Sequence, residues 1–317
     1  MKFKIFIDGK EGTTGLRIFE RFQSRDDIEL INISEELRKD PEERRKCINA
    51  SDITFLCLPD QAAIEAVALL DADNKHTKII DASTAHRTNE TFAYGFPELG
   101  PEFLEKIKKS QFVATPGCYA SGFISIVYPL VKLGIASNEY PFSANAISGY
   151  SGAGKKGIAQ YEDSNRAAEF EAPRLYAMAQ MHKHLKEMQY FPKLKEKPLF
   201  NPYVCDFIQG MLVTIPLYAD RLNKKYTPAE IREELANFYK NQDFVRVMPY
   251  DEKGTESGFL SANHLAGKDF LEIYVSGNEE RINITACLDN LGKGASGAAV
   301  ECMNIMLGLD PKKGLVL

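Results

Sequence analysis

Strand and helix signals alternate through the first third of the chain, and this alternation limits the possible folds more than any other feature. Short apolar or β-branched runs predict strands at residues 2–8, 28–34, 52–58 and 78–82. The segments between them predict helices that begin at Thr13 or Thr14, at Pro41 and at Gln61. Strands separated by helices pair in parallel, so we expect a doubly wound, Rossmann-like α/β domain here.

The rest of the chain has a different pattern, with longer strands and a turn signal between two of them. Strands are predicted at 210–218, 244–249, 270–276 and 281–288, and helices at 123–133, 227–242 and 295–307. Gly277 and Asn278, between the last two of these strands, are typical of a β-hairpin between antiparallel strands. The 317 residues suffice for two domains at about 150 residues each. We therefore expect a second, α+β domain with a mixed, largely antiparallel sheet.

Charge and residue usage exclude several classes of protein. Lys and Arg number 39 against 44 Asp and Glu, and the resulting net charge of -5 argues against a nucleic-acid partner, which needs a basic surface. No apolar run approaches the roughly 20 residues that span a bilayer. The N-terminus also lacks the apolar segment of a secretory signal. These features predict a cytoplasmic protein without a membrane partner, and they leave room for a small anionic ligand.

The cysteines and histidines do not form a metal-binding pattern. The six cysteines are far apart in sequence, without a C-x-x-C pair, at positions 47, 57, 118, 205, 287 and 302. His182 and His184 are close together, but no acidic or thiol residue has the spacing of a further ligand. We expect no metal site and no disulfide.

A glycine-rich loop lies between the first predicted strand and the first predicted helix. Gly9, Gly12 and Gly15 occur in GKEGTTG, together with Thr13 and Thr14. Backbone N–H groups at such a helix start bind the pyrophosphate of a dinucleotide. The spacing is G-x-x-G-x-x-G rather than G-x-G-x-x-G, so an ordinary glycine-rich connection is the alternative. The position directly after a strand favours dinucleotide binding.

The end of the second predicted strand indicates which dinucleotide is bound. An acidic residue there suits a ribose hydroxyl, whereas Ser or Arg suits the 2′-phosphate of NADP(H). Ser34 ends the strand, and Arg38 and Lys39 follow it. These residues predict NADP(H), although Glu35 and Glu36 make a solvated run of charges the alternative.

One cysteine lies where a reactive thiol is expected. Cys118 follows Pro116 and Gly117, which end a strand and turn the chain into an apolar helix. The helix dipole at this position lowers the pKa of a thiol, and a thiolate is the form that attacks an acyl carbon. A buried structural cysteine at a helix start is the alternative.

Eight motifs, in order along the chain, resemble those of one family. They are GKEGTTG (9–15), DASTAHR (81–87), YGFPEL (94–99), PGCYAS (116–121), SGYSGAG (148–154), HKHLKE (182–187), QGMLVTIPL (209–217) and DNLGKGASG (289–297). Together they resemble the short, type 2 subgroup of the N-acetyl-γ-glutamyl-phosphate reductases, in the aspartate-semialdehyde dehydrogenase superfamily. The resemblance implies NADPH-dependent reduction of N-acetyl-γ-glutamyl phosphate to N-acetylglutamate 5-semialdehyde, with release of phosphate, in arginine biosynthesis. The alternatives are an aspartate-semialdehyde dehydrogenase acting on aspartyl phosphate and a non-catalytic dinucleotide-binding sensor.

The same resemblance implies roles for individual residues. Cys118 corresponds to the nucleophile that forms a thioester, and His182 to the acid–base group. Tyr176, His184 and Glu187 correspond to substrate-binding positions around that histidine. If the segment is extended, His182 and His184 share a face, whereas in a helix His184 and Glu187 do. The sequence leaves both geometries open.

Further residues complete the expected site. Arg87 is the candidate for the substrate phosphate, because its planar guanidinium suits bidentate oxyanions, and Lys155 or Lys156 is a weaker one. His86 in the same motif has no role that the sequence explains.

Gly152, Gly154 and Asn290 resemble cofactor contacts of the family. If so, the C-terminal helix returns to the first domain. That arrangement predicts a dinucleotide-binding domain over 1–117 and 295–317, and a catalytic and dimerisation domain over 118–294. The resemblance further implies a homodimer or homotetramer.

Overall fold

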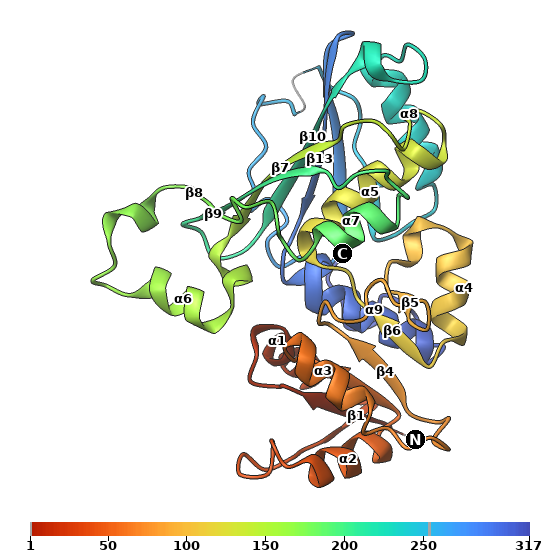
Figure 1. The fold of residues 1–317 in the computed structure, drawn as a ribbon, viewed down its shortest axis with the longest axis vertical. Helices are drawn as coiled ribbons and strands as arrows, with labels where there is room; N and C mark the ends of the chain where they lie inside the picture. Colours follow the sequence, from red (N-terminus) through yellow and green to blue (C-terminus); the bar gives the residue numbers. More distant parts are fainter. Residues whose placement is uncertain (1, 253–254) are drawn as a thin grey trace. The chain divides into compact units, whose positions relative to one another are not determined.

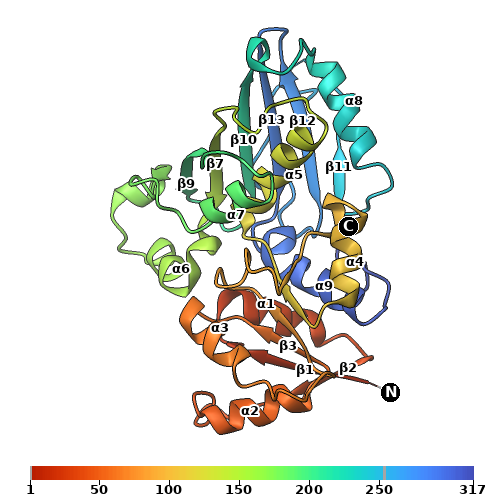
Figure 2. The same ribbon diagram turned by 45° about the vertical axis from the view of Figure 1, so that its right-hand side comes forward.

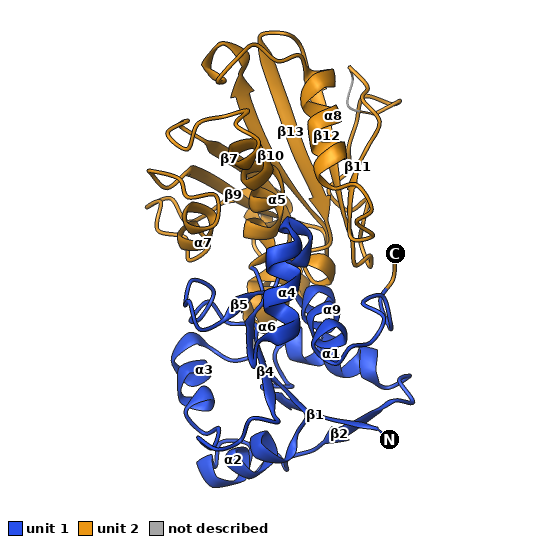
Figure 3. Cartoon of the chain, turned by 90° about the vertical axis from the view of Figure 1, so that its right-hand side faces the viewer, with its two compact units in different colours: residues 1–116, 295–315 blue, residues 117–294, 316–317 orange. Residues whose placement is uncertain are grey.

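The computed structural model describes residues 2–252 and 255–317 (Figure 1). The chain divides into two compact units (Figure 3). Unit 1 contains Met1–Pro116 and Ala295–Leu315, and unit 2 contains Gly117–Gly294 and Val316–Leu317. Gly117 and the last two residues belong to unit 2, whereas the sequence analysis assigns them to the first domain. Gly117 is the N-cap residue of the helix that begins at Cys118. Val316 and Leu317 are the end of the tail. They join unit 2 through a pair of hydrogen bonds, because the backbone of Val316 donates to the Asp269 carboxylate and its carbonyl accepts from the Asp269 backbone.

Unit 1 is the expected parallel sheet with helices on both faces. Its strand order is β2-β1-β3-β4-β6-β5. The strands are β1 (Phe3–Asp8), β2 (Ile28–Ile31), β3 (Ile53–Leu56), β4 (Lys78–Asp81), β5 (Ala93–Tyr94) and β6 (Phe112–Ala114). The helices are α1 (Thr13–Phe22), α2 (Pro41–Ala50), α3 (Asp60–Val67), α4 (Pro101–Lys109) and α9 (Gly297–Met306). The second strand ends at Ile31, so the predicted strand over 28–34 is too long, and Ser34 lies in the turn that follows.

Two apolar clusters bury the two faces of this sheet. On one face, Ile18 of α1, Ile107 of α4 and Val300 of α9 pack in one cluster with strand residues. On the other face, Ile48 of α2 and Ala63 of α3 pack in a second cluster. Burying both faces of a parallel sheet requires helices on each, and the central strand β3 is accordingly buried along its whole length.

Unit 2 is built on a mixed sheet with the order β11-β12-β13-β10-β7-β9-β8. Its strands are β7 (Ser143–Gly149), β8 (Arg174–Leu175), β9 (Leu199–Cys205), β10 (Met211–Tyr218), β11 (Val245–Val247), β12 (Leu271–Gly277) and β13 (Arg281–Leu288). Only the β7–β9 and β11–β12 pairs among its neighbours are parallel in the described residues. The largely antiparallel second sheet is thus confirmed. β12 and β13 form the predicted hairpin, but Gly277 is the last residue of β12 and residues 278–280 connect the two strands, so the turn lies after Gly277.

The helices of unit 2 are α5 (Cys118–Lys132), α6 (Gly154–Glu162), α7 (Leu185–Tyr190) and α8 (Pro228–Phe238). The short 3-10 helices of the chain are η1 (Pro97–Leu99), η2 (Tyr150–Ala153), η3 (Ala168–Glu171) and η4 (Ala219–Arg221), and Gly292–Ser296 forms a π-helical turn, η5. α5 and α8 cover one face of the sheet (Figure 2). The approach of α5 to β10 is close enough that a Cβ on Gly122 would stand 2.6 Å from a Val213 methyl group. Across the described residues, no helix combines the length and apolar character needed to cross a membrane.

Candidate functional site

The glycine loop of unit 1 forms a tight turn between β1 and α1. Gly9 has a φ of +86°, and a Cβ there would lie 2.3 Å from the Cys57 carbonyl oxygen of the neighbouring strand connection. A Cβ on Gly15 would lie 2.4 Å from the Gly9 carbonyl oxygen. Both positions therefore require glycine. Gly12 is the N-cap residue of α1, and a Cβ there would lie 3.3 Å from the Gly9 carbonyl oxygen.

Thr13 and Thr14 begin α1 directly after this loop. The Thr13 hydroxyl oxygen is buried and has no hydrogen-bond partner among the described residues. A buried hydroxyl without a partner at a helix start fits an absent phosphate oxygen, because such groups are otherwise hydrogen-bonded. The loop thus fits the pyrophosphate of a dinucleotide.

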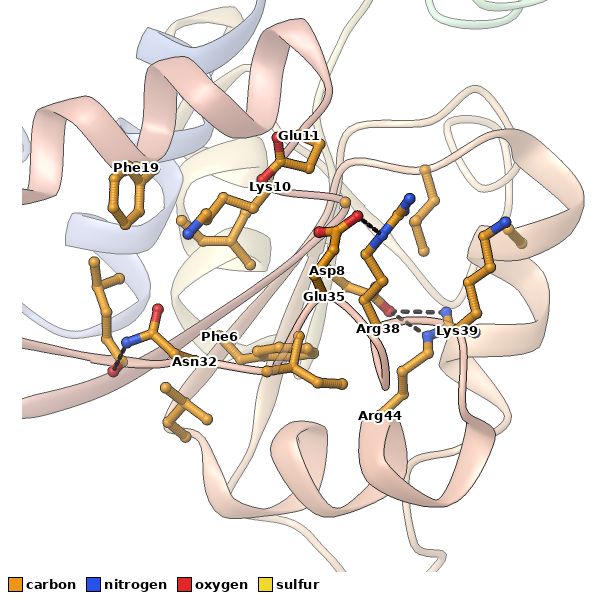
Figure 4. Close-up of a pocket in the computed structure, with 17 residues that line it drawn as sticks. Phe6, Asp8, Lys10, Glu11, Phe19, Asn32, Glu35, Arg38, Lys39 and Arg44 are labelled. Carbon is orange, nitrogen blue, oxygen red and sulfur yellow. Dashed lines mark hydrogen bonds and ion pairs between the residues drawn. The ribbon is translucent and has the colours of Figure 1, made fainter.

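A cavity of about 450 Å³ opens beside this loop (Figure 4). It lies at the carboxyl ends of β1 and β2, and Gly9, Lys10, Asn32, Arg38 and Lys39 are among the residues that line it. This is the place where open α/β sheets bind ligands. Ser34 does not line the cavity among the described residues, whereas Arg38 does, with its guanidinium 2.6 Å from a Glu35 carboxylate oxygen.

The sequence analysis missed a second arginine in this cavity. Arg44, from the first half of α2, donates through Nε and a terminal nitrogen to the Asp8 carboxylate at 3.0 and 2.8 Å. Burial raises the pKa of Asp8, while the hydrogen bonds from Arg44 oppose that shift. The pair consists of an acidic residue at the end of β1 and an arginine in α2. Because the two lie far apart in sequence, their contact is apparent only once β1 and α2 are placed in the fold.

The DASTAHR segment forms a bonded loop at the end of β4 in unit 1. The His86 imidazole lies 2.7 Å from the Asp81 carboxylate and stacks on Phe92, which explains the histidine that had no role. The Arg87 guanidinium donates to the backbone carbonyls of Thr115 and Ala82. Arg87 is thereby held to the strand end that leads, three residues later, to Cys118.

Cys118 is the first residue of α5 in unit 2, and it is partly exposed. Gly117 precedes the helix without a side-chain cap. The first-turn N–H groups of an α-helix lack intrahelical partners, and their partial positive charge favours a thiolate at this position. A Cβ on Gly294 would come within 2.7 Å of the Cys118 Cβ, so the segment after β13 passes against Cys118 and needs glycine there.

Aromatic side chains gather next to this cysteine. The His182 ring lies 5.6 Å from Tyr119, 5.8 Å from Tyr176 and 5.2 Å from Phe200, measured between ring centroids. Burial raises the pKa of both tyrosines, and the charge of Cys118 acts on each of them in the same direction. Both phenols are therefore neutral donors near pH 7. The site brings together the predicted Cys118, Tyr176 and His182 and adds Tyr119 and Phe200, which the sequence analysis missed.

The segment around His182 is neither the extended chain nor the helix that the sequence left open. It is a turn before α7, in which the His184 backbone N–H donates to His182 Nδ1 at 3.1 Å. His184 is buried, and three residues later the Glu187 carboxylate, also buried, accepts from the Gly117 backbone N–H at 3.2 Å. Glu187 thus contacts the residue that precedes Cys118.

The predicted cofactor contacts of unit 2 lie in a second group. The Asn290 amide donates to the Ser151 hydroxyl at 2.9 Å and accepts from the Gly210 backbone at 2.8 Å. A Cβ on Gly152 would be 3.3 Å from the same amide, and Gly154 has a φ of +72° at the start of α6. Lys155 and Lys156 follow in α6. Within the described ranges, no group of three or more His, Cys, Asp or Glu side chains is arranged to hold a metal ion.

Comparisons with known proteins identify the two domains of the chain. The family model described as semialdehyde dehydrogenase, NAD binding domain, matches residues 10–107, and the semialdehyde dehydrogenase dimerisation domain matches residues 118–290. The chain is 46% identical over 99% of both chains to N-acetyl-gamma-glutamyl-phosphate reductase 2 of Nostoc sp.. It is 46% identical, over 97% of this chain and all of the other, to N-acetyl-gamma-glutamyl-phosphate reductase of Brucella ovis.

Solved structures agree in fold. Aspartate semialdehyde dehydrogenase II of Vibrio cholerae matches 97% of this chain and 99% of its own with a TM-score of 0.69 at 15% identity. The enzyme of Francisella tularensis matches 96% and 100% with a TM-score of 0.70 at 14% identity. At such identities the likeness establishes the fold alone.

Proposed function

The chain belongs to the N-acetyl-gamma-glutamyl-phosphate reductase family, whose two domains are those of the semialdehyde dehydrogenases, and on this premise we propose the reaction and the residues that perform it. The chain reduces N-acetyl-γ-glutamyl phosphate to N-acetylglutamate 5-semialdehyde in arginine biosynthesis. The observation that carries this reading is a partly exposed thiol at a helix start in the same unit as His182, the buried Tyr119 and the partly buried Tyr176.

The cofactor is NADP(H), and the residues of unit 1 fit it. The glycine loop and the Thr13 hydroxyl are proposed to bind the pyrophosphate. Thr14, the second residue of α1, is proposed to contribute to the same site. Arg38 at the rim of the cavity is proposed to bind the 2′-phosphate, because an exposed guanidinium exchanges a weak partner such as Glu35 for a phosphate. When bound, NADPH supplies the hydride that reduces the thioester. The proposals that Ser34, Gly152, Gly154 and Asn290 contact the cofactor stay predictions.

The covalent chemistry belongs to Cys118. Its sulfur attacks the acyl carbon, and the bond from that carbon to the phosphate oxygen breaks. The thiol proton leaves with the phosphate as HPO₄²⁻, so a thioester remains. After hydride reaches the same carbon, the tetrahedral oxyanion re-forms its C=O bond and expels the thiolate as the aldehyde departs. One proton from solvent restores the thiol, which balances the overall reaction.

The remaining site residues are proposed to bind substrate. Arg87 is the candidate for the substrate phosphate. Tyr176 and His184 contact the ring of His182. His182 is proposed to interact with the carbonyl oxygen of the substrate. Glu187 is proposed to act by holding Gly117, since its carboxylate already accepts that backbone N–H.

Unit 2 carries a dimerisation domain and also a sheet face that α5 and α8 leave uncovered. We call it the outer face, and its residues alternate with the buried ones along each strand: Asn145, Ile147, Leu199, Asn201, Tyr203, Thr214, Pro216, Tyr218, Asn283 and Thr285. Ile147, Leu199 and Tyr218 are exposed on it. An uncovered sheet face with apolar side chains fits a second copy of the chain, so a homodimer is proposed, and a homotetramer would need a further surface. A cytoplasmic location stays a prediction of the sequence.

The deciding experiment compares two substrates. NADPH oxidation is measured with N-acetyl-γ-glutamyl phosphate and with aspartyl phosphate, and faster turnover of the aspartyl compound would refute the proposed substrate. Cys118→Ser is expected to abolish turnover and to leave NADPH binding intact. An unchanged rate in Cys118→Ser would instead rule out the thioester route, and absence of turnover with either substrate would favour a dinucleotide-binding sensor.

A further inference from the structure

The backbone around His182 determines which ring nitrogen carries its proton. The His184 backbone N–H donates to His182 Nδ1 at 3.1 Å. An amide N–H has no lone pair to offer, so Nδ1 must present its own lone pair to it. A neutral ring in this position therefore carries its hydrogen on Nε2. Adding a proton to Nδ1 would direct two N–H groups at one another, which disfavours the imidazolium.

This turn is held at both ends. Before it, Gln180 has a left-handed φ of +56°, and its side-chain amide makes two hydrogen bonds with the backbone of Phe200 in β9, donating at 2.8 Å and accepting at 2.9 Å. After it, the Leu185 N–H donates to the His182 carbonyl as α7 begins. A left-handed glutamine is uncommon and persists only where its surroundings compensate it. The position of His182 Nδ1 against the His184 amide is thus fixed by β9 on one side and by α7 on the other.

The groups near His182 include both neutral and charged side chains. Tyr119 from α5 and Tyr176 after β8 are phenols with raised pKa values, and the His184 ring lies 4.6 Å away in a T-shaped contact. Glu187 of α7 is buried, and its carboxylate accepts from the Gly117 backbone. Lys183 is exposed and would disfavour a second positive charge. Cys118 lies close enough to Tyr176 for its charge to act on that phenol, and a thiolate there would favour the imidazolium of His182.

We propose that His182 acts as a neutral imidazole, donating a hydrogen bond from Nε2–H to the substrate oxygen, rather than as a carrier of protons. This inference rests on the proposed reduction of an acyl phosphate. The carbonyl oxygen of the substrate becomes an oxyanion in two steps of the reaction: when the Cys118 sulfur adds to the acyl carbon, and when hydride adds to the thioester carbon. A fixed donor stabilises both oxyanions without transferring a proton. The second oxyanion expels a thiolate, which needs no proton from the protein.

The test measures the tautomer and the titration of the His182 ring, and it does not depend on turnover. In the full-length protein labelled with ¹⁵N-histidine, two-bond ¹H–¹⁵N correlations report the tautomer and titration of each ring, and the His182 signals are those lost in His182→Gln. The Nε2–H tautomer at pH 7 is expected, with a titration midpoint below the ordinary value of about 6.5. An Nδ1–H tautomer or an imidazolium at pH 7 would overturn the proposal, whatever the substrate assay shows.

A pair of variants at residue 184 isolates the cause. His184 has a φ of -76°, which proline adopts, so His184→Pro removes the donating N–H while His184→Ala keeps it. The midpoint of His182 is expected to rise in His184→Pro relative to His184→Ala. Equal midpoints in the two folded variants would show that the amide does not control the ring, and the wild-type tautomer decides the question if the proline variant does not fold.

Turnover gives a third readout. His182→Ala is expected to lower kcat by about 10²–10³-fold, the usual loss when one oxyanion donor is removed. His182→Gln offers an amide N–H in place of Nε2–H and should recover at least about tenfold of that loss. A proton carrier would be replaced by neither residue, so equally low kcat values would contradict a donor role.

Discussion

The carboxylate of Glu187 accepts a hydrogen bond from the backbone N–H of Gly117 across 3.2 Å, and Gly117 directly precedes Cys118, the proposed nucleophile. Seventy residues of chain separate the two partners. Both are buried, so this bond links the start of α7 to the start of α5 within unit 2. The last residue of the HKHLKE motif therefore contacts the PGCYAS motif in the folded chain. A substrate-binding role, which the resemblance suggested for Glu187, does not account for this bond.

Replacing Glu187 tests whether it positions the nucleophile. Glu187→Ala leaves the buried Gly117 N–H without a partner, a loss of about 1–3 kcal/mol, and should lower kcat by roughly tenfold to a hundredfold. Glu187→Gln retains an acceptor and should lose less. The rate of Cys118 alkylation by iodoacetamide should fall in the same order. A rise in KM alone, with kcat and alkylation unchanged, would return Glu187 to the substrate-binding role.

The sequence predicts well those features that depend on a few neighbouring residues. The parallel order of unit 1, the hairpin at Gly277 and the place of Cys118 at a helix start all follow from local patterns. The second strand was predicted to reach Ser34 because Ile33 continues the apolar pattern, but pairing with β1 stops at Ile31. Alternation of side chains along a strand does not reveal where its partner ends.

Contacts between distant segments are what the sequence did not predict. Arg44 pairs with Asp8 across 36 residues, and Gln180 pairs with the backbone of Phe200 across 20. Neither pair has a motif, because each depends on how a helix or a turn is placed against a strand. The turn at His182 was missed for the same reason, since its geometry is set by Gln180 before it and by α7 after it.

Gly9→Ala should damage both the stability of unit 1 and cofactor binding. A Cβ at this position meets the Cys57 carbonyl at 2.3 Å, and the φ of +86° is strained for alanine, so a loss of about 1–3 kcal/mol in unfolding free energy is expected. NADPH affinity, measured by cofactor fluorescence, should fall with it. Gly12→Ala is the matched control, because its Cβ comes no closer than 3.3 Å to another atom. Equal destabilisation by both variants would contradict this steric account.

The two arginines of the cavity should differ in their effect on cofactor choice. Arg38 is exposed and paired only at the surface, so Arg38→Ala should weaken NADPH by about tenfold or more and leave NADH nearly unchanged. Arg44→Ala removes the partner of a buried carboxylate and should destabilise unit 1 by about 3–5 kcal/mol while weakening both cofactors. Dissociation constants for NADPH and NADH, with urea unfolding of each variant, separate the two effects. If Arg38→Ala weakened the two cofactors equally, Arg38 would not bind the 2′-phosphate.

Acid should destabilise unit 1 through Asp27. The Arg25 guanidinium donates to both Asp27 oxygens at 2.7 and 2.8 Å, and the Lys313 ammonium lies 2.9 Å from one of them. These hydrogen bonds, that of Arg25 first, hold the pKa of Asp27 far below its ordinary value of 3.8. Because the folded pKa is the lower one, the carboxylate stabilises the fold fully above the ordinary value. That stabilisation is lost as the pH falls below 3.8 towards the folded pKa.

Asp27→Asn should therefore reduce the free energy of unfolding by about 1–3 kcal/mol at pH 6, and by much less at pH 2. Urea unfolding followed by circular dichroism across this range makes the comparison. Asp71→Asn is the control, since Asp71 pairs with Arg45 at the surface and should contribute less than about 1 kcal/mol at either pH. If the difference between wild type and Asp27→Asn stayed constant from pH 6 to pH 2, the Asp27 carboxylate would not be the group whose charge stabilises the fold.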